Sequence, residues 1–308
     1  MQHKRGISGF AAVAVVALAG TACSSSGTTG ATGGTTGSDP AAAGAHTEAL
    51  TVLAKMPAPQ AVAQTTKTVS AKKSVKVHMT MKSPTLNETA DGSMSYGGAA
   101  KADLTMSMSS DSPQVGPLFE QMGQMEMRMD GTVAWLNMGH SAQMKAALQG
   151  KAWVKMDFAQ IAGDPQLKSF SFLKDVLKNN DPGAQLHALL ASPDLKLAGT
   201  EPHGGVQTLH YAGDLSADDL TKMVAGATLT QDDVNAIKDT LQQAGVTKAS
   251  YDVWIDGDGL PVAVKFSEDT KVGTVSGDLT YRDWGAPVTV TAPPADQTAD
   301  ILSLLNGQ

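Results

Sequence analysis

Apolar and polar residues alternate with a period of two along much of this chain, and this pattern constrains its fold more than any other feature. Successive side chains of a β-strand point to opposite sides, so the alternation predicts strands with one buried and one solvated face. Such segments lie at 75–82, 102–108, 126–129, 132–138 and 152–158, and further strands are expected at 207–211, 250–255, 262–266, 273–281 and 288–291. Hairpin turns are expected at Asp91-Gly92, Asp130-Gly131 and Asp256–Gly259.

Helices are expected before, between and after these strands. Residues 47–70 have helical spacing, which Pro57 and Pro59 interrupt. Further helices are expected to begin near Pro165, Pro182, Ser216 and Thr230, and a short one at 301–305. Strands, helices and strands follow one another without a βαβ rhythm. The sequence therefore predicts an α+β fold, with one long antiparallel β-sheet and helices gathered on one face.

The first 22 residues have the features of an export signal. Two basic residues precede an apolar run at 10–19, which is too short to span a bilayer. Small residues follow, and then Cys23, the only cysteine of the chain. This order resembles the lipobox of bacterial lipoproteins, in which the cysteine is acylated, although Gly20 stands where the lipobox usually has leucine. Two interpretations are open: lipid attachment at Cys23, or ordinary cleavage after Ala22 that leaves a free thiol.

Three parts are expected along the chain: a signal peptide at 1–22, a lipidated Cys23 with a flexible Gly/Ser/Thr tether at 23–45, and a single domain at 46–308. Removal of the signal peptide leaves 21 basic and 30 acidic residues, a net charge of −9. This charge argues against nucleic acid and against electrostatic attachment to anionic lipid headgroups. We therefore expect anchorage to the outer face of the cell membrane through acyl chains on Cys23.

No catalytic constellation is apparent. The sequences Ser70–Lys73 and Ser171–Lys174 match a Ser-x-x-Lys motif but lack its companion motifs. The histidines have neither metal-ligand spacing nor a thiol partner. Asp256 and Asp258 lack the further ligands of a calcium loop. We expect no enzyme, no metal and no cofactor.

Methionine is concentrated in one region, because twelve of the 15 methionines lie between Met79 and Met156, and several form i, i+2 pairs on the predicted strands. Methionine adapts to irregular space, whereas Val, Ile and Phe hold one packing arrangement. Two interpretations compete: the methionines pack the sheet against helices, or they line a deformable cavity for an apolar ligand. The candidate lining residues are Val77, Met79, Met81, Leu104, Met106, Met108, Met127, Met129, Trp135, Val154 and Met156.

Several short segments resemble a known family. They are Gly199–Glu201, Gly205–Thr208, Val253–Asp256, Gly259–Pro261, Trp153–Asp157 and Tyr281–Val290. In these segments, over about residues 60–294, the chain resembles the mycobacterial lipoprotein family LppX/LprA/LprF/LprG, which is similar in fold to the carrier LolA. The methionine-rich strands are not part of that resemblance, so it does not identify a ligand.

The resemblance implies a curved antiparallel half-barrel with helices across its concave face. It also implies a cavity for an acylated lipid or lipoglycan, a membrane tether, and a part in carrying lipid within the cell envelope. A membrane transporter would be a fitting partner, but no motif identifies one. The alternative is a sensory or scaffolding module that binds a protein or an envelope polymer on its outer surface. An envelope hydrolase is disfavoured because no nucleophile can be paired with a base.

Overall fold

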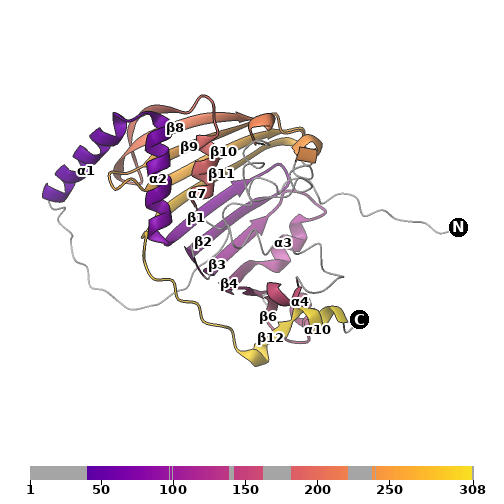
Figure 1. Ribbon diagram of the computed structural model, residues 1–308. Coiled ribbons are helices and arrows are strands. Elements are labelled where there is room, and N and C mark those ends of the chain that lie inside the picture. Colours follow the sequence, from indigo (N-terminus) through magenta and orange to yellow (C-terminus); the bar gives the residue numbers. More distant parts are fainter. Residues whose placement is uncertain are drawn as a thin grey trace.

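The computed structural model describes residues 40–96, 98, 100–138, 142–161, 182–220, 238–239 and 241–306. The signal peptide, Cys23 and most of the tether therefore lie outside the described residues. The helices expected from Pro165 and Thr230 lie outside them as well. The described part contains one large mixed β-sheet and a few helices (Figure 1).

Twelve strands form this sheet within the described residues, in the order β12-β6-β5-β4-β3-β2-β1-β11-β10-β9-β8-β7. Their bounds are β1 Ser74–Lys82, β2 Asn87–Ser95, β3 Lys101–Ser109, β4 Gln124–Asp130, β5 Val133–Asn137, β6 Trp153–Asp157, β7 Lys196–His203, β8 Val206–Ser216, β9 Lys248–Ile255, β10 Pro261–Thr270, β11 Gly273–Arg282 and β12 Thr298–Asp300. All neighbours are antiparallel except β12, which pairs with β6 in parallel. The sheet thus consists of two consecutive meanders, β1–β6 and β7–β11, joined by the pairing of β1 with β11.

Helices lie across the concave side of the curved sheet (Figure 1). Their bounds are α1 Pro40–Ala54, α2 Ala58–Lys72, α3 Gly116–Met122, α4 Ala142–Ala147, α5 Phe158–Ile161, α7 Gly183–Leu190 and α10 Ile301–Asn306. Helix α2 begins after Pro57 and ends at Lys73, whose φ of 64° is left-handed. It packs against α7, which in turn packs against β8 and β9. The α+β fold with a curved, predominantly antiparallel sheet is confirmed.

One continuous hydrophobic core lies between these helices and the sheet face that they cover, which we call the inner face. Val62 and Val69 of α2 are fully buried in it, as are Leu186 and Leu189 of α7. The sheet contributes alternate residues of each strand, for example Leu279 of β11. The intervening residues form the outer face, which is mainly polar.

Two of the expected turns are confirmed. Asp130 ends β4, and Gly131 follows with a φ of 61°, a value that glycine adopts without strain. In the turn between β9 and β10, the Asp256 carboxylate accepts hydrogen bonds from the backbone N–H groups of Asp258 and Leu260, at 2.9 and 3.0 Å.

Asp91-Gly92, by contrast, is not a turn: both residues lie inside β2. The chain turns instead after Lys82, where the Ser83 N–H donates to the Leu86 carbonyl at 2.8 Å. The Asp91 carboxylate lies 2.8 Å from His78 Nδ1 on the adjacent strand β1. Because His78 supplies a hydrogen-bond partner for the Asp91 carboxylate, Asp91 is accommodated inside the strand and does not form a turn.

The termini of the domain also differ from expectation. Residues 288–291, expected as a strand, lie outside every strand of the sheet. The last strand is β12, followed directly by the expected terminal helix, α10. Helix α1 begins at Pro40, inside the segment expected to be tether.

Candidate functional site

Methionines and other apolar residues of neighbouring strands lie in continuous rows on the inner face. Leu104 of β3 is opposite Met127 of β4, which is opposite Leu136 of β5 and then Val154 of β6. A parallel row runs through Met129, Ala134 and Met156 of β4, β5 and β6. Opposed residues of neighbouring strands share a face. The register therefore places every candidate lining residue except Trp135 on the inner face.

These residues differ in how deeply they are buried. Val77, Met79, Leu104, Met129 and Val154 are all buried, each with at most 5% of its surface exposed. The half-buried members of the set are Met81, Met106, Met108, Met127 and Met156. The buried residues pack the core, whereas the half-buried methionines leave part of an apolar surface uncovered. That these residues line a cavity stays a prediction.

The prediction that Trp135 belongs to this set is wrong. Trp135 lies opposite Arg128 on β4 and Lys155 on β6, which places it on the outer face. Arg128 also stacks over the ring of Trp153, 4.8 Å from its centroid, and Arg128 Nε lies 3.5 Å from Asp103 Oδ1.

Sequence reasoning missed two inner-face residues, Leu136 and Met125. The signal was present in the alternation itself. Because Trp135 alternates with Ala134 and Leu136, and the turn at Gly131 fixes the register with β4, Leu136 falls opposite Met127.

Sequence reasoning also missed three polar side chains on the inner face, those of Glu88, Tyr251 and Glu268. Glu88 of β2 lies between Met81 of β1 and Met108 of β3, and burial raises the pKa of its carboxyl. Glu268 of β10 lies between two buried apolar residues, Val275 and Ala249.

Glu268 and Tyr251 are the most deeply buried of these groups. They expose only 7% and 4% of their surface, respectively. Glu268 Oε1 and Tyr251 Oη have no hydrogen-bond partner within the described part of the chain. Burial raises the pKa of Glu268 to about 7. Burial and the nearby Glu268 charge also raise the pKa of the Tyr251 hydroxyl.

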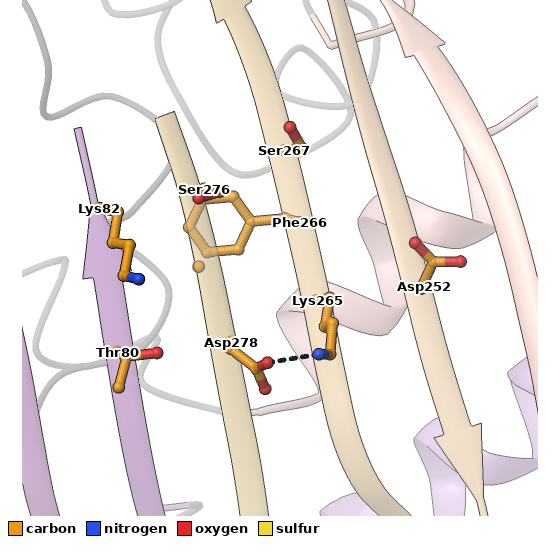
Figure 2. Close-up of a pocket in the computed structure, with 9 residues that line it drawn as sticks. Thr80, Lys82, Asp252, Lys265, Phe266, Ser267, Ser276 and Asp278 are labelled. Atoms are coloured by element: carbon orange, nitrogen blue, oxygen red, sulfur yellow. Dashed lines mark ion pairs between the residues drawn. The ribbon is translucent and has the colours of Figure 1, made fainter. Parts of the chain in front are cut away.

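A hollow of about 400 Å³ lies over β1, β9, β10 and β11 (Figure 2). Its lining is mainly polar: Thr80, Lys82, Asp252, Lys265, Phe266, Ser267, Ser276, Gly277 and Asp278. Lys265 Nζ and Asp278 Oδ2 form an ion pair at 2.6 Å, marked in Figure 2. By strand alternation, most of these side chains belong to the outer face. This hollow is therefore a different feature from the methionine rows of the inner face.

Trp254 is the centre of a set of contacts between strands on the outer face. Trp254 Nε1 donates to Glu201 Oε1 at 2.6 Å, and the His210 ring stacks on the indole at 4.4 Å. His210 Nε2 lies 2.7 Å from Asp252 Oδ1. These contacts tie β7, β8 and β9 together.

The described residues contain no group of three or more His, Cys, Asp or Glu side chains arranged to hold a metal ion. His140 and the side chain of His187 are not among the described positions. None of the helices in the described ranges combines the length and apolar character needed to cross a bilayer.

Sequence comparison identifies relatives of this chain. It is 32% identical over 174 residues to an uncharacterized 31.2 kDa protein of Streptomyces griseus, covering 56% of this chain and 54% of that protein. It is 35% identical over 118 residues to the lipoprotein LprA of Mycobacterium tuberculosis, covering 37% of this chain and 41% of LprA. These matches show that the chain is similar to lipoproteins of the LppX/LprA/LprF/LprG group.

A further relative in the LppX/LprA/LprF/LprG group is the lipoarabinomannan carrier protein LprG of Mycobacteroides abscessus. It is 32% identical over 114 residues, covering 37% of this chain and 43% of LprG. The chain spans about half the length of the curated relatives it matches. No protein-family model matches it. Among solved structures, LprF of Mycobacterium bovis aligns over 77% of this chain and 96% of LprF, with 18% identity and a TM-score of 0.46.

Proposed function

We propose that this protein is an exported lipoprotein, anchored to the outer face of the cell membrane through Cys23, that binds an acylated lipid against its inner face. Its role would be to carry that lipid within the cell envelope. The observation that carries the proposal is the set of half-buried methionines on the helix-covered face, at Met81, Met106, Met108, Met127 and Met156. The relative named as a lipoarabinomannan carrier supports the same class of ligand.

Transfer free energy explains why such a carrier would use a covered face. At about 0.8 kcal/mol per methylene, one palmitoyl chain exposed to water costs roughly 12 kcal/mol. A surface contact that leaves much of the chain in water offsets little of this cost. An apolar sheet face that helices cover can shield far more of it. Methionine suits this task because its unbranched side chain adapts to chains of different shape.

Native mass spectrometry of the full chain tests the proposal. The chain is expressed in an actinobacterial host and extracted with a mild detergent. We expect a non-covalent adduct with the mass of an acylated lipid, in addition to any covalent acyl groups on Cys23. A Cys23→Ala chain, which cannot carry the covalent group, should retain the adduct. Absence of any lipid adduct from both chains would contradict the proposal.

A second candidate function is recognition of a protein or envelope polymer on the outer face. The hollow lined by Lys82, Lys265 and Asp252 favours it, because charged and hydroxyl groups suit a polar partner. Changes on the inner face should leave such recognition intact, whereas Lys82→Ala with Lys265→Ala should weaken it. Pull-down of envelope polymers with these variants distinguishes the two functions.

A further inference from the structure

The inner face has one polar end. A row of opposed residues crosses the sheet through Met108, Glu88, Met81, Gly277, Phe266 and Tyr251. Glu268 lies two residues beyond Phe266 on β10 and therefore sits diagonally beside Tyr251 on the same face. This row lies at the carboxyl end of β1, and the rows through Leu104 and Met129 lie further from that end.

Two polar atoms at this end of the inner face are buried without hydrogen-bond partners among the described residues, which lowers the stability of the fold. A buried hydroxyl or carboxyl without a hydrogen-bond partner destabilises a fold, and such groups usually signal a role beyond packing. The neighbours of Glu268 on the adjacent strands are Val275 and Ala249, so an apolar residue would suit this position better for packing alone. Two such groups, Tyr251 Oη and Glu268 Oε1, lie on neighbouring strands.

We propose that Tyr251 and Glu268 bind the head group of the lipid, and that this head group is uncharged and bears hydroxyl groups. The inference rests on the proposed function and specifies its ligand. The Oε1 atom of Glu268, unpartnered within the part of the chain that the structure describes, can accept a hydrogen bond whether or not the carboxyl is ionised, so its natural partner is an O–H or N–H donor. The phenol can accept from the same donor or donate to an ester oxygen.

Charge on the inner face disfavours a phosphate, the commonest alternative head group. Glu88 and Glu268 are both carboxyls on this face, three strands apart, or about 14 Å at the usual strand spacing of about 4.8 Å. A phosphate placed between them would be repelled by both when they are ionised. Burial raises the pKa of each carboxyl, and a nearby phosphate would raise it further, so binding a phosphate there would cost free energy.

A competition experiment tests the head-group preference. The full-length Cys23→Ala chain is used, because it lacks the acyl anchor and needs no detergent. The neutral apolar dye N-phenyl-1-naphthylamine is displaced by 1-palmitoylglycerol, methyl palmitate or hexadecyl phosphate, which share one chain length. We expect 1-palmitoylglycerol to compete roughly tenfold better than methyl palmitate, which lacks a donor, and hexadecyl phosphate to compete least well.

Variants assign the preference to the two side chains. Tyr251→Phe with Glu268→Leu should bring 1-palmitoylglycerol down to the affinity of methyl palmitate, while methyl palmitate binding, which reports correct folding, stays unchanged. Glu268→Gln keeps a carbonyl acceptor without charge, so it should retain the preference and bind hexadecyl phosphate several-fold better.

Matched controls come from elsewhere in the chain. Tyr96→Phe alters a buried tyrosine whose hydroxyl donates to the Val69 carbonyl at 2.9 Å, and Glu120→Gln alters an exposed carboxylate. Neither control should change the ratio of affinities. Equal binding of 1-palmitoylglycerol and methyl palmitate by the parent chain would overturn this inference and leave the proposed function standing. Failure of all three ligands to displace the dye would overturn both.

Discussion

Met106 of β3 lies directly opposite Met125 of β4, and the two side chains differ sharply in burial. Met125 is 4% exposed, whereas Met106 is only half-buried and packs at the edge of the core. The same contrast holds along the β4 strand between buried Met129 and half-buried Met127. The inner face thus combines residues that are packed in the core with residues that leave part of an apolar surface uncovered.

Bulky residues at the half-buried positions should obstruct lipid binding. We expect Met106→Trp with Met127→Trp to remove most of the lipid adduct seen by native mass spectrometry, because indole rings would occupy the uncovered apolar surface. Ser107→Trp places the same bulk on the outer face and serves as the control, for which the adduct should persist. An unchanged adduct in the double variant would show that the lipid binds elsewhere on the protein.

Glu268 should make stability depend on pH. Its folded-state pKa of about 7 lies above the ordinary value of 4.5, so the folded protein holds this proton more tightly than the unfolded chain does. The associated stabilisation is complete below about pH 4.5 and is lost as the pH rises to about 7, by at most about 3 kcal/mol. Urea unfolding at pH 5 and pH 8 measures this loss.

Glu268→Gln isolates that contribution from those of other titrating groups. The pKa values of Glu88 and Asp256 are also raised, and those of Asp194 and Asp214 are lowered, so the parent chain reports a sum. The variant should gain stability relative to the parent at pH 8 and little at pH 5. A constant difference between the two chains at both pH values would mean that Glu268 does not titrate abnormally.

Gly277 should tolerate no side chain, because a Cβ there would collide with the ring of Phe266 on the adjacent strand. We expect Gly277→Ala to lower the free energy of unfolding by about 1–3 kcal/mol, since overpacking displaces the ring. Phe266→Leu should restore most of this loss in the double variant. Gly199→Ala is the matched control in β7, where a Cβ meets no atom within 4 Å, and it should be close to neutral.

Cys23 should determine where the protein resides. We expect the parent chain in the membrane fraction, with an acylated N-terminal peptide detected by mass spectrometry, because two or more acyl chains anchor stably. Cys23→Ala should move the protein to the soluble exported fraction. Labelling of the mature parent chain by a maleimide would instead support ordinary cleavage after Ala22 and a free thiol.

The period-two pattern predicted the sheet well because burial of one strand face is a local property of the sequence. Strand neighbours were harder to predict, because pairing depends on distant residues. Asp91-Gly92 looks like a turn in isolation, but His78 on β1 supplies a partner for Asp91 within the ladder. No pattern local to β2 contains that information.

The sequence predicted which strand face carries the candidate site but not all of the residues on it. Methionine alternation indicated the inner face, but Trp135, which was expected among the lining residues, is excluded from that face by its alternation with Leu136. The sequence does not single out Glu268, because a single carboxyl in a strand usually faces solvent. Its burial results from β9, β11 and the core around them, which the sequence of β10 alone does not reveal.

The order of the strands has a consequence for biogenesis. The first meander, β1–β6, is synthesised well before β11, which pairs with β1 some two hundred positions later (Lys76 with Arg282, for example), and before β12, which pairs with β6. Closure over such sequence distances is slow, because the entropy of a long loop is lost before the contacts form. During that interval the sulfur-rich side of the nascent half-sheet has no second half beside it, so its apolar surface would be exposed to water unless a chaperone or a membrane surface covered it.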